Sequence, residues 1–484
     1  MSLVEESGGP IALRVVESAD QLDASAATAE LRLDVSEALR ILPDRREVYA
    51  GQLCSNQQAV VAKRFLVHPK QARDWRREWD GLVQLNALGL SAPTPLCVAE
   101  EADGSAVWVI MARIEGAVSV QDAFLDGDSD ERTELAQQLA KLVDAAHRAG
   151  VRQRDQHVDN WAWDGARLYL LDAGSIEFSK RALSERARLQ DLAGICVTLG
   201  PEAECAFREA IRSKYLIDDQ ALKGRLLDEL DGAIVALQTE RARRYFKKTR
   251  RTCTEFVDTK ADAYHALHLR QAAPELIEAF LSDPEALMLQ GRRLKSGNTS
   301  TVQGFEYAGK AYVLKRYNKK PLMNRIRHLF SGSRALKSWS SSWVLEMAFI
   351  PTARAVAVYE DTRERLPGVR YLLMEQIEGR ILPDYVESCG ADLAQVEAVA
   401  EAFAQIWSAL GRLRAAHGDL KATNLIVGPD GRLHLFDLDA FRFGLKANAF
   451  ERGRAKDLRR FMQNWAGRPE LVELFESKLR EVSE

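Results

Sequence analysis

Residues 417–424 read HGDLKATN, and the apolar run LHLFDLD follows at residues 433–439. Asp419 and Asn424 lie five positions apart, and Asp437 stands at the end of the apolar run. In phosphoryl transfer from a magnesium-bound nucleotide, one carboxylate accepts a hydroxyl proton, while an amide oxygen and a second carboxylate hold hard cations. The order and chemistry of these three side chains therefore predict a phosphotransferase site.

The same pattern occurs in the first half of the chain. RDQHVDN at residues 154–160 contains Asp155 and Asn160, and LYLLDAGS then places Asp172 at the end of an apolar run. The second copy follows at a shift of 264 residues for the first carboxylate and the amide, and of 265 for the second carboxylate. A register kept over this distance indicates an internal duplication.

Each copy is preceded by a lysine on a segment with strand-like alternation, Lys63 in VVAKRF and Lys315 in AYVLKRY. A lysine here would bind the α- and β-phosphates, and a glutamate on the next helix would orient it. Glu78 fits that role for Lys63. The second copy has no acid in the matching stretch before Glu346, so its ion pair is in doubt.

The phosphate-loop signals are weaker. LKSGNTSTVQGF offers Gly297 among small hydroxyl residues whose backbone N–H groups could face phosphate. The first copy offers only VYAGQLCSNQQ, where a plain β-turn explains Gly51 as well as a nucleotide lid does. Neither segment is GxGxxG, so Gly297 alone is retained as a predicted nucleotide contact.

Composition limits the class of protein. The 484 residues suggest two or three domains, and 67 basic against 70 acidic residues leave a net charge of −3. Local basic runs at residues 241–251 and 315–337 could meet phosphate-bearing glycolipid or anionic headgroups, or could be solvated helix faces. The six scattered cysteines form no CxxC pair, and neither a leader peptide nor an apolar membrane span is evident. We expect a cytoplasmic protein that could contact a membrane face.

The residues of HGDLKATN, FDLD, RDQHVDN and LLDAGS, with the lysine strands and their Trp-containing helices, resemble the bacterial lipopolysaccharide core kinases that act on heptose and Kdo. The likeness covers most of both halves. It implies transfer from ATP, with Mg²⁺, to a sugar hydroxyl of the inner core at the cytoplasmic face of the inner membrane. The implied catalytic residues are Asp155 and Asp419; the metal ligands are Asn160, Asp172, Asn424 and Asp437; the nucleotide contacts are Lys63, Glu78, Lys315, Gly297 and Lys421.

We therefore expect an α+β fold of two tandem protein-kinase-like units, each with a small sheet-rich lobe and a mostly helical lobe, over residues 1–258 and 259–484. The expected partner is lipopolysaccharide core or a related glycolipid, with peripheral contact to the inner membrane and no nucleic acid. Two alternatives stay open. One or both units could be a pseudokinase that scaffolds an envelope enzyme complex, or the acceptor could be a soluble sugar, an antibiotic or a protein.

Overall fold

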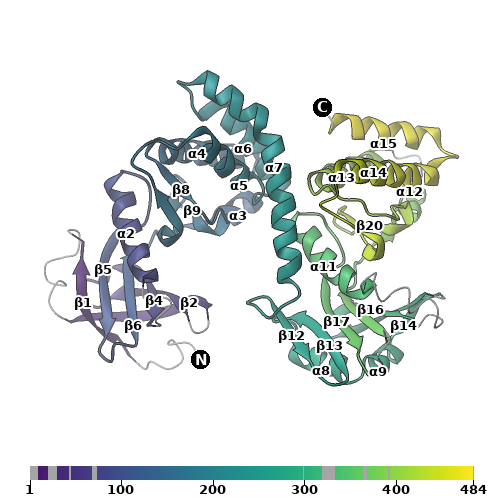
Figure 1. Cartoon of the computed structure of the whole chain (residues 1–484), viewed down its shortest axis with the longest axis horizontal. Coiled ribbons are helices and arrows are strands. Elements are labelled where there is room, and N and C mark those ends of the chain that lie inside the picture. Colours follow the sequence, from purple (N-terminus) through teal and green to yellow (C-terminus); the bar gives the residue numbers. More distant parts are fainter. Residues whose placement is uncertain are drawn as a thin grey trace. The chain divides into compact units, whose positions relative to one another are not determined.

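The computed structural model describes residues 9–19, 30–42, 45–67, 73–297, 299–318, 333–363, 368–390 and 393–482. The chain divides into two compact units, residues 1–234 and 235–484, each of which is described by itself. The division falls within helix α7 (Gln220–Lys248) (Figure 1). The boundary expected after residue 258 would fall within strand β12 (Phe256–Lys260). It stays a prediction about where one functional domain ends.

The first unit begins with a closed barrel whose strands pair in the order β1-β2-β3-β4-β6-β5. Its strands are β1 (Ile11–Ser18), β2 (Leu31–Leu42), β3 (Arg46–Leu53), β4 (Ala59–Leu66), β5 (Pro95–Glu101) and β6 (Ala106–Ala112). Helix α2 (Asp74–Ala87) connects β4 to β5. Apolar side chains that alternate along these strands fill the barrel, among them Leu33, Tyr49 and Trp108.

A mostly helical lobe follows in the first unit. Its elements are β7 (Val118–Ser119), α3 (Val120–Asp126), α4 (Ser129–Arg148), β8 (Val151–Gln153), β9 (Trp161–Trp163), β10 (Leu168–Leu170), β11 (Ile176–Phe178), α5 (Glu185–Cys196) and α6 (Pro201–Lys214). Short 3₁₀ turns lie at Val158–Asn160 and Ala173–Ser175. The strands β10, β9 and β7 pair in that order. The turn Asp164–Gly165 closes the β9–β10 hairpin, since the Asp164 carboxylate accepts from the next backbone N–H groups and Gly165 takes φ 93°.

The second unit begins with an open sheet of order β12-β13-β17-β18-β16-β15-β14. The further bounds are β13 (Tyr264–Leu269), α8 (Pro274–Ser282), α9 (Pro284–Leu289), β14 (Arg292–Ser296), β15 (Ser300–Tyr307), β16 (Lys310–Tyr317), α11 (Arg334–Met347), β17 (Ala355–Asp361) and β18 (Arg370–Glu375). Its helical lobe contains β19 (Arg380–Ile381), α12 (Leu382–Cys389), α13 (Leu393–Arg412), β20 (Leu425–Val427), β21 (Leu433–Leu435), α14 (Ala447–Met462) and α15 (Pro469–Glu481), with 3₁₀ turns at Ala422–Asn424, Leu438–Ala440 and Gln463–Trp465.

The two units repeat one topology. The pairing order β2-β3-β4-β6-β5 of the first unit recurs as β14-β15-β16-β18-β17 in the second, and α2 and α11 each follow the lysine strand. The small sheet β10-β9-β7 likewise recurs as β21-β20-β19. The predicted α+β fold with two tandem kinase-like units is confirmed.

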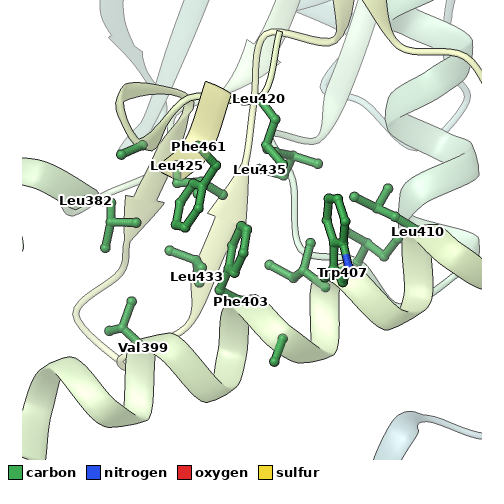
Figure 2. Packing of buried hydrophobic residues seen from close by; sticks show 14 of the residues in the cluster. Leu382, Val399, Phe403, Trp407, Leu410, Leu420, Leu425, Leu433, Leu435 and Phe461 are labelled. Atoms are coloured by element: carbon green, nitrogen blue, oxygen red, sulfur yellow. The ribbon is translucent and has the colours of Figure 1, made fainter. Parts of the chain in front are cut away.

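The core of the second helical lobe anchors the segment that contains the predicted catalytic residues. Phe403 on α13 stacks on Phe461 of α14, with ring centroids 3.9 Å apart. Leu420, within the HGDLKATN loop, and Leu425, directly after it, point into the same buried cluster (Figure 2). Because Leu420 and Leu425 are buried, Asp419 and Asn424, which directly precede them, are fixed at the edge of a rigid core.

Arg64 links four strands of the first barrel. It lies on β4 and donates to Glu47 of β3 and to Glu101 of β5, and Trp108 of β6 also donates to Glu101. Burial alone would raise the pKa of Glu101, but the hydrogen bonds from Arg64, Ser105 and Trp108 outweigh it and lower that pKa. The ionised form of Glu101 is therefore the one that the fold stabilises.

We expect this network to make the first unit acid-sensitive. A carboxyl group whose pKa is lowered by folding contributes stability above its unfolded pKa, about 4.3 for Glu, and that contribution is lost as the pH falls through the lowered folded pKa. Glu101→Gln should therefore unfold at a lower temperature than the wild type at pH 7, and the gap should close at acid pH. Thermal denaturation followed by tryptophan fluorescence measures the gap, with the exposed Glu37→Gln as control. A gap that is independent of pH would contradict the assignment.

Candidate functional site

Lys63 and Glu78 form a buried ion pair in the first unit. Lys63 Nζ on β4 lies 2.5 Å from Glu78 Oε1 on α2 and donates to Leu171 O at 3.1 Å. The Glu78 side chain is 1% exposed, so it is held by this pair and not by water. Its other oxygen accepts from Gly174 N at 3.0 Å. The sequence predicted this pair, and the structure brings its members together.

Asp172 lies beside the same lysine. Its Oδ1 is 3.9 Å from Lys63 Nζ and 3.5 Å from a guanidinium nitrogen of Arg46, and its Oδ2 accepts from the Ser175 hydroxyl at 2.8 Å. Burial alone would raise the pKa of Asp172, but the charges of Lys63 and Arg46 outweigh it and lower that pKa. Asp172 is therefore an anion between two fixed cations. Arg46 was not predicted from the sequence; it is the first residue of β3, the second strand of the β2–β3 hairpin. Gly51, for which the sequence left a turn or a nucleotide lid open, lies within β3.

The β9–β10 hairpin brings Asn160 next to Asp172. Leu171 N donates to Asn160 O at 3.0 Å, and the Asn160 side-chain amide donates to Asp155 O at 2.7 Å. Asn160 is thus fixed by backbone contacts on both sides. The Asp155 carboxylate is exposed, and within the described ranges no cation forms an ion pair with it.

In the second unit Lys315 is held by two aspartates from one loop. Its Nζ on β16 lies 2.8 Å from Asp437 Oδ1 and 2.9 Å from Asp439 Oδ1. Burial alone would lower the pKa of Lys315, but the electrostatic influence of Tyr317, Asp439 and Asp437 outweighs it and raises that pKa. Burial likewise would raise the pKa of Asp437, and Lys315 lowers it instead. Asp437 itself adopts left-handed backbone with φ 62°, a conformation that costs a non-glycine residue about 1–3 kcal/mol.

Asp439 is a site residue that the sequence interpretation missed. Its Oδ1 accepts from Lys315, from the Tyr317 hydroxyl at 2.7 Å and from the Ser338 hydroxyl at 2.9 Å. Ser338 is the fifth residue of α11, as Glu78 is the fifth residue of α2. The acid that partners the lysine has therefore moved from the helix to the loop.

The two arrangements compete for the same space beside the lysine. In the first unit the loop position that corresponds to Asp439 is Gly174, where an added Cβ would lie 2.9 Å from Glu78 Oε2. A side chain at Gly174 would therefore collide with the helix acid, whereas the small Ser338 leaves room for the loop acid. The signal in the sequence was the second aspartate of FDLD together with a serine directly before Trp339, where the first copy has Glu78 before Trp79.

Two other expectations concern this unit. Glu346, the first acid after Lys315 in the helix, pairs with Arg354 at 3.4 Å instead of with the lysine. Gly297 lies in the β14–β15 hairpin, where its N–H donates to Ser300 O at 3.1 Å and its carbonyl accepts from Asn318 at 3.0 Å. Residue 298 lies outside the described residues. The hairpin position suits a nucleotide lid, and the role of Gly297 stays a prediction.

The loop at residues 417–424 repeats the backbone contacts of the loop at residues 154–160, but cations lie beside its aspartate. The Asn424 amide donates to Asp419 O at 2.8 Å, and Phe436 N donates to Asn424 O at 3.1 Å, which brings Asn424 next to Asp437. The two oxygens of the Asp419 carboxylate face cations, Lys421 at 3.0 Å and Arg460 at 2.6 Å.

Two buried residues hold this loop from behind. Asp457 on α14 accepts from Gly418 N through both oxygens, each at 3.0 Å. His417 is fully buried and its Nε2 lies 3.0 Å from Phe436 O. Burial lowers the pKa of His417, so its neutral form with hydrogen on Nε2 fits this contact. Both residues fix the backbone around Asp419.

The basic runs have mainly structural contacts where they can be described. In residues 241–251, Arg243 donates to Gly444 O, Lys248 pairs with Glu255, and Arg250 donates to Ser340. Most of the run at 315–337 lies outside the described residues, which omit 319–332. Among the helices that the structure describes, none has the length and apolar composition needed to cross a membrane.

Comparison with known proteins agrees with this geometry. The sequence model of the lipopolysaccharide kinase (Kdo/WaaP) family matches residues 44–199 and 285–474, that is, one segment in each unit. The two segments together cover more than two thirds of the chain, and each contains the lysine strand, the Asp-Asn loop and the second aspartate. No curated protein matches the chain. Because both repeats of the site lie within the matched segments, we conclude that the chain belongs to the lipopolysaccharide kinase (Kdo/WaaP) family.

Proposed function

We propose that the protein transfers the γ-phosphoryl group of magnesium-bound ATP to a sugar hydroxyl, heptose or Kdo, of the lipopolysaccharide inner core. The observation that supports this most directly is that each unit places a buried lysine against an aspartate that the neighbouring hairpin aligns with an asparagine. This arrangement combines a fixed cation for phosphate with oxygen ligands for a hard metal ion.

The residues fit the proposed nucleotide and metal. Lys63 and Lys315 would contact the α- and β-phosphates, and Glu78 and Asp439 hold them in place. Asn160 with Asp172, and Asn424 with Asp437, would supply oxygen ligands to Mg²⁺, which when bound neutralises phosphate charge during transfer. Among the described residues no three His, Cys, Asp or Glu side chains gather at one point. A magnesium ion that takes the remaining ligands from phosphate and water is compatible with such a sparse set.

The chemical step assigns one role to each catalytic aspartate. The acceptor hydroxyl oxygen forms a bond to the γ-phosphorus, the bond from that phosphorus to the bridging oxygen of ATP breaks, and ADP leaves. The hydroxyl proton passes to Asp419 in the second unit and to Asp155 in the first. The backbone contacts of Asn424 and Asn160 hold these two aspartates in position.

The proposal is tested with labelled ATP, Mg²⁺ and dephosphorylated inner-core lipopolysaccharide on vesicles, with the full chain. We expect labelled phosphate on the core sugars, dependent on Mg²⁺ and absent when the acceptor is omitted. Vesicles without lipopolysaccharide, with and without anionic lipid, show whether the chain also contacts the membrane face. Intact nucleotide binding with no transfer to any glycolipid acceptor would overturn the proposal.

A second candidate is that one unit binds nucleotide without transferring phosphate. The specific observation is that the two catalytic loops differ: Asp419 is paired with two cations, whereas Asp155 has no cationic partner among the described residues. Thermal shift with millimolar Mg-ATP on the full-length variants Lys63→Met and Lys315→Met separates the two sites, because each variant retains one nucleotide site. A unit that binds nucleotide and yields no product would be a pseudokinase module.

A further inference from the structure

Three cationic side chains surround the proposed base of the second unit. Lys421 and Arg460 each pair with one oxygen of Asp419, at 3.0 and 2.6 Å. Lys456 donates to the carbonyl of Gly418, the residue before the base, at 3.3 Å. The Lys421 and Arg460 side chains are 40% and 37% exposed, so an acceptor can reach them. The Asp419 carboxylate thus has a cation on each oxygen, a third cation contacts the carbonyl before it, and the buried carboxylate of Asp457 lies behind the loop.

The first unit lacks all three cations at the corresponding positions. His157 stands two residues after Asp155, where Lys421 follows Asp419. Helices α5 and α14 each contain a buried aspartate followed by leucine, DLAG in the first and DLRR in the second. Counting from that aspartate, Gly194 corresponds to Arg460 and Gln190 corresponds to Lys456.

The place of Arg460 is filled differently in the first unit. A Cβ on Gly194 would lie 1.4 Å from Gln156 Oε1, because the Gln156 side chain packs across the glycine. The Gln156 side-chain amide donates to Asp191 Oδ1 at 2.5 Å. The first unit therefore cannot place a long cation there without displacing Gln156, and the difference between the two sites involves several residues.

Stability does not account for the cationic cluster. Partly exposed ion pairs contribute little to the free energy of folding, and Lys421 and Arg460 repel each other across a single carboxylate. This repulsion is relieved when a second anion binds the guanidinium and ammonium groups, and arginine matches the geometry of carboxylate and phosphate.

We infer that the second unit binds an acceptor with a carboxylate or phosphate beside the hydroxyl that is phosphorylated, and that Arg460 with Lys456 holds that anion. The first unit takes an acceptor that is uncharged at this position. The inference rests on the proposed function and narrows the acceptor class of one of its two sites. In this inference Arg460 is a specificity residue that contacts the substrate.

The experiment uses the full chain with the first site inactivated by Asp155→Asn. Acceptors are an inner-core oligosaccharide with its carboxylate and phosphate groups, the same sugar with carboxyl groups reduced to alcohols, and the same sugar after phosphatase treatment. Arg460→Gln is compared with Arg459→Gln, which changes an exposed arginine on the same helix. Initial rates give KM for acceptor and for ATP, and calorimetry without nucleotide gives acceptor affinity.

We expect Arg460→Gln to weaken the charged acceptor about 10–100-fold, as loss of a hydrogen bond to a charged group does, with KM for ATP unchanged. Arg460→Gln should hardly change binding of the acceptor that lacks the anion held by Arg460. Whether this is the carboxyl-reduced or the phosphatase-treated sugar identifies that anion as carboxylate or phosphate. Equal effects on charged and neutral acceptors, or an equal effect of Arg459→Gln, would overturn the inference. Arg460-dependent binding without any transfer would uphold it while contradicting the proposed function, and neither binding nor transfer would contradict both.

Discussion

Asp419→Asn in the full chain is expected to lower phosphate transfer by the second unit about 10²–10⁴-fold, the usual contribution of a general base. Asparagine keeps the size of the side chain but cannot accept the hydroxyl proton. The fold should survive, because the pairs that Asp419 makes with Lys421 and Arg460 are partly exposed. Asp155→Asn should remove a separate activity, and the double variant should remove both.

The measurement is labelled phosphate per acceptor position, resolved by mass spectrometry of the product sugars. Asp430→Asn is the matched control, since it changes an exposed aspartate in the β20–β21 hairpin of the same lobe. Mg-ATP affinity should stay unchanged in all variants. If either single variant keeps full turnover at every position, the unit that contains it is not a catalyst.

The second large effect is expected when the acidic partner of Lys315 is moved from the loop back to helix α11. Asp439→Gly removes the acceptor of three hydrogen bonds and leaves Lys315 with Asp437 alone. Asp437 is then held more tightly by the lysine and less available to a metal ion. Removal of one partner from a buried charge cluster destabilises a fold by about 3–5 kcal/mol. Because Lys315 then competes with the metal ion for Asp437, Mg-ATP affinity should also fall, by at least about tenfold, which corresponds to about 1.4 kcal/mol.

Adding Ser338→Glu to Asp439→Gly should restore most of that affinity. Position 338 occupies the same place in α11 as Glu78 in α2, and a glycine at position 439 reproduces the space at Gly174. Calorimetry in a Lys63→Met background isolates the second nucleotide site. Glu346→Gln is the control, because Glu346 pairs with Arg354 and should leave affinity unchanged. A double variant no better than Asp439→Gly would refute the idea that the acid has moved.

Much of the first site was predictable from sequence because its parts are local patterns. The Asp-Asn spacing, the hairpin with a turn at Asp164–Gly165 and the aspartate that ends an apolar run together place Asn160 beside Asp172. Lys63 and Glu78 follow from a strand and the helix after it. Each of these relations depends on a short stretch of backbone geometry.

The remaining features depend on the register between distant segments. Both helices contain a Trp-x-x-x-Trp spacing, with Trp75 and Trp79 in α2 and Trp339 and Trp343 in α11. Matching the two spacings would align Trp75 with Trp339, but the helix positions show that Trp79 and Trp339 correspond. The shift of four residues hid the replacement of Glu78 by Ser338. Arg460 was missed for a related reason, since 41 residues separate it from Asp419 and only the packing of α14 brings the two together.

The two ways of holding the lysine differ in what can control them. In the first unit the acid lies on α2, so any partner or ligand that displaces this helix would separate Glu78 from Lys63 and switch the nucleotide site off. In the second unit the acid lies two residues after Asp437, on the loop that already contacts the lysine. Displacement of α11 would break the Ser338 contact and leave the lysine with both aspartates. One chain thus joins a site open to regulation through a helix with a site that is insulated from it.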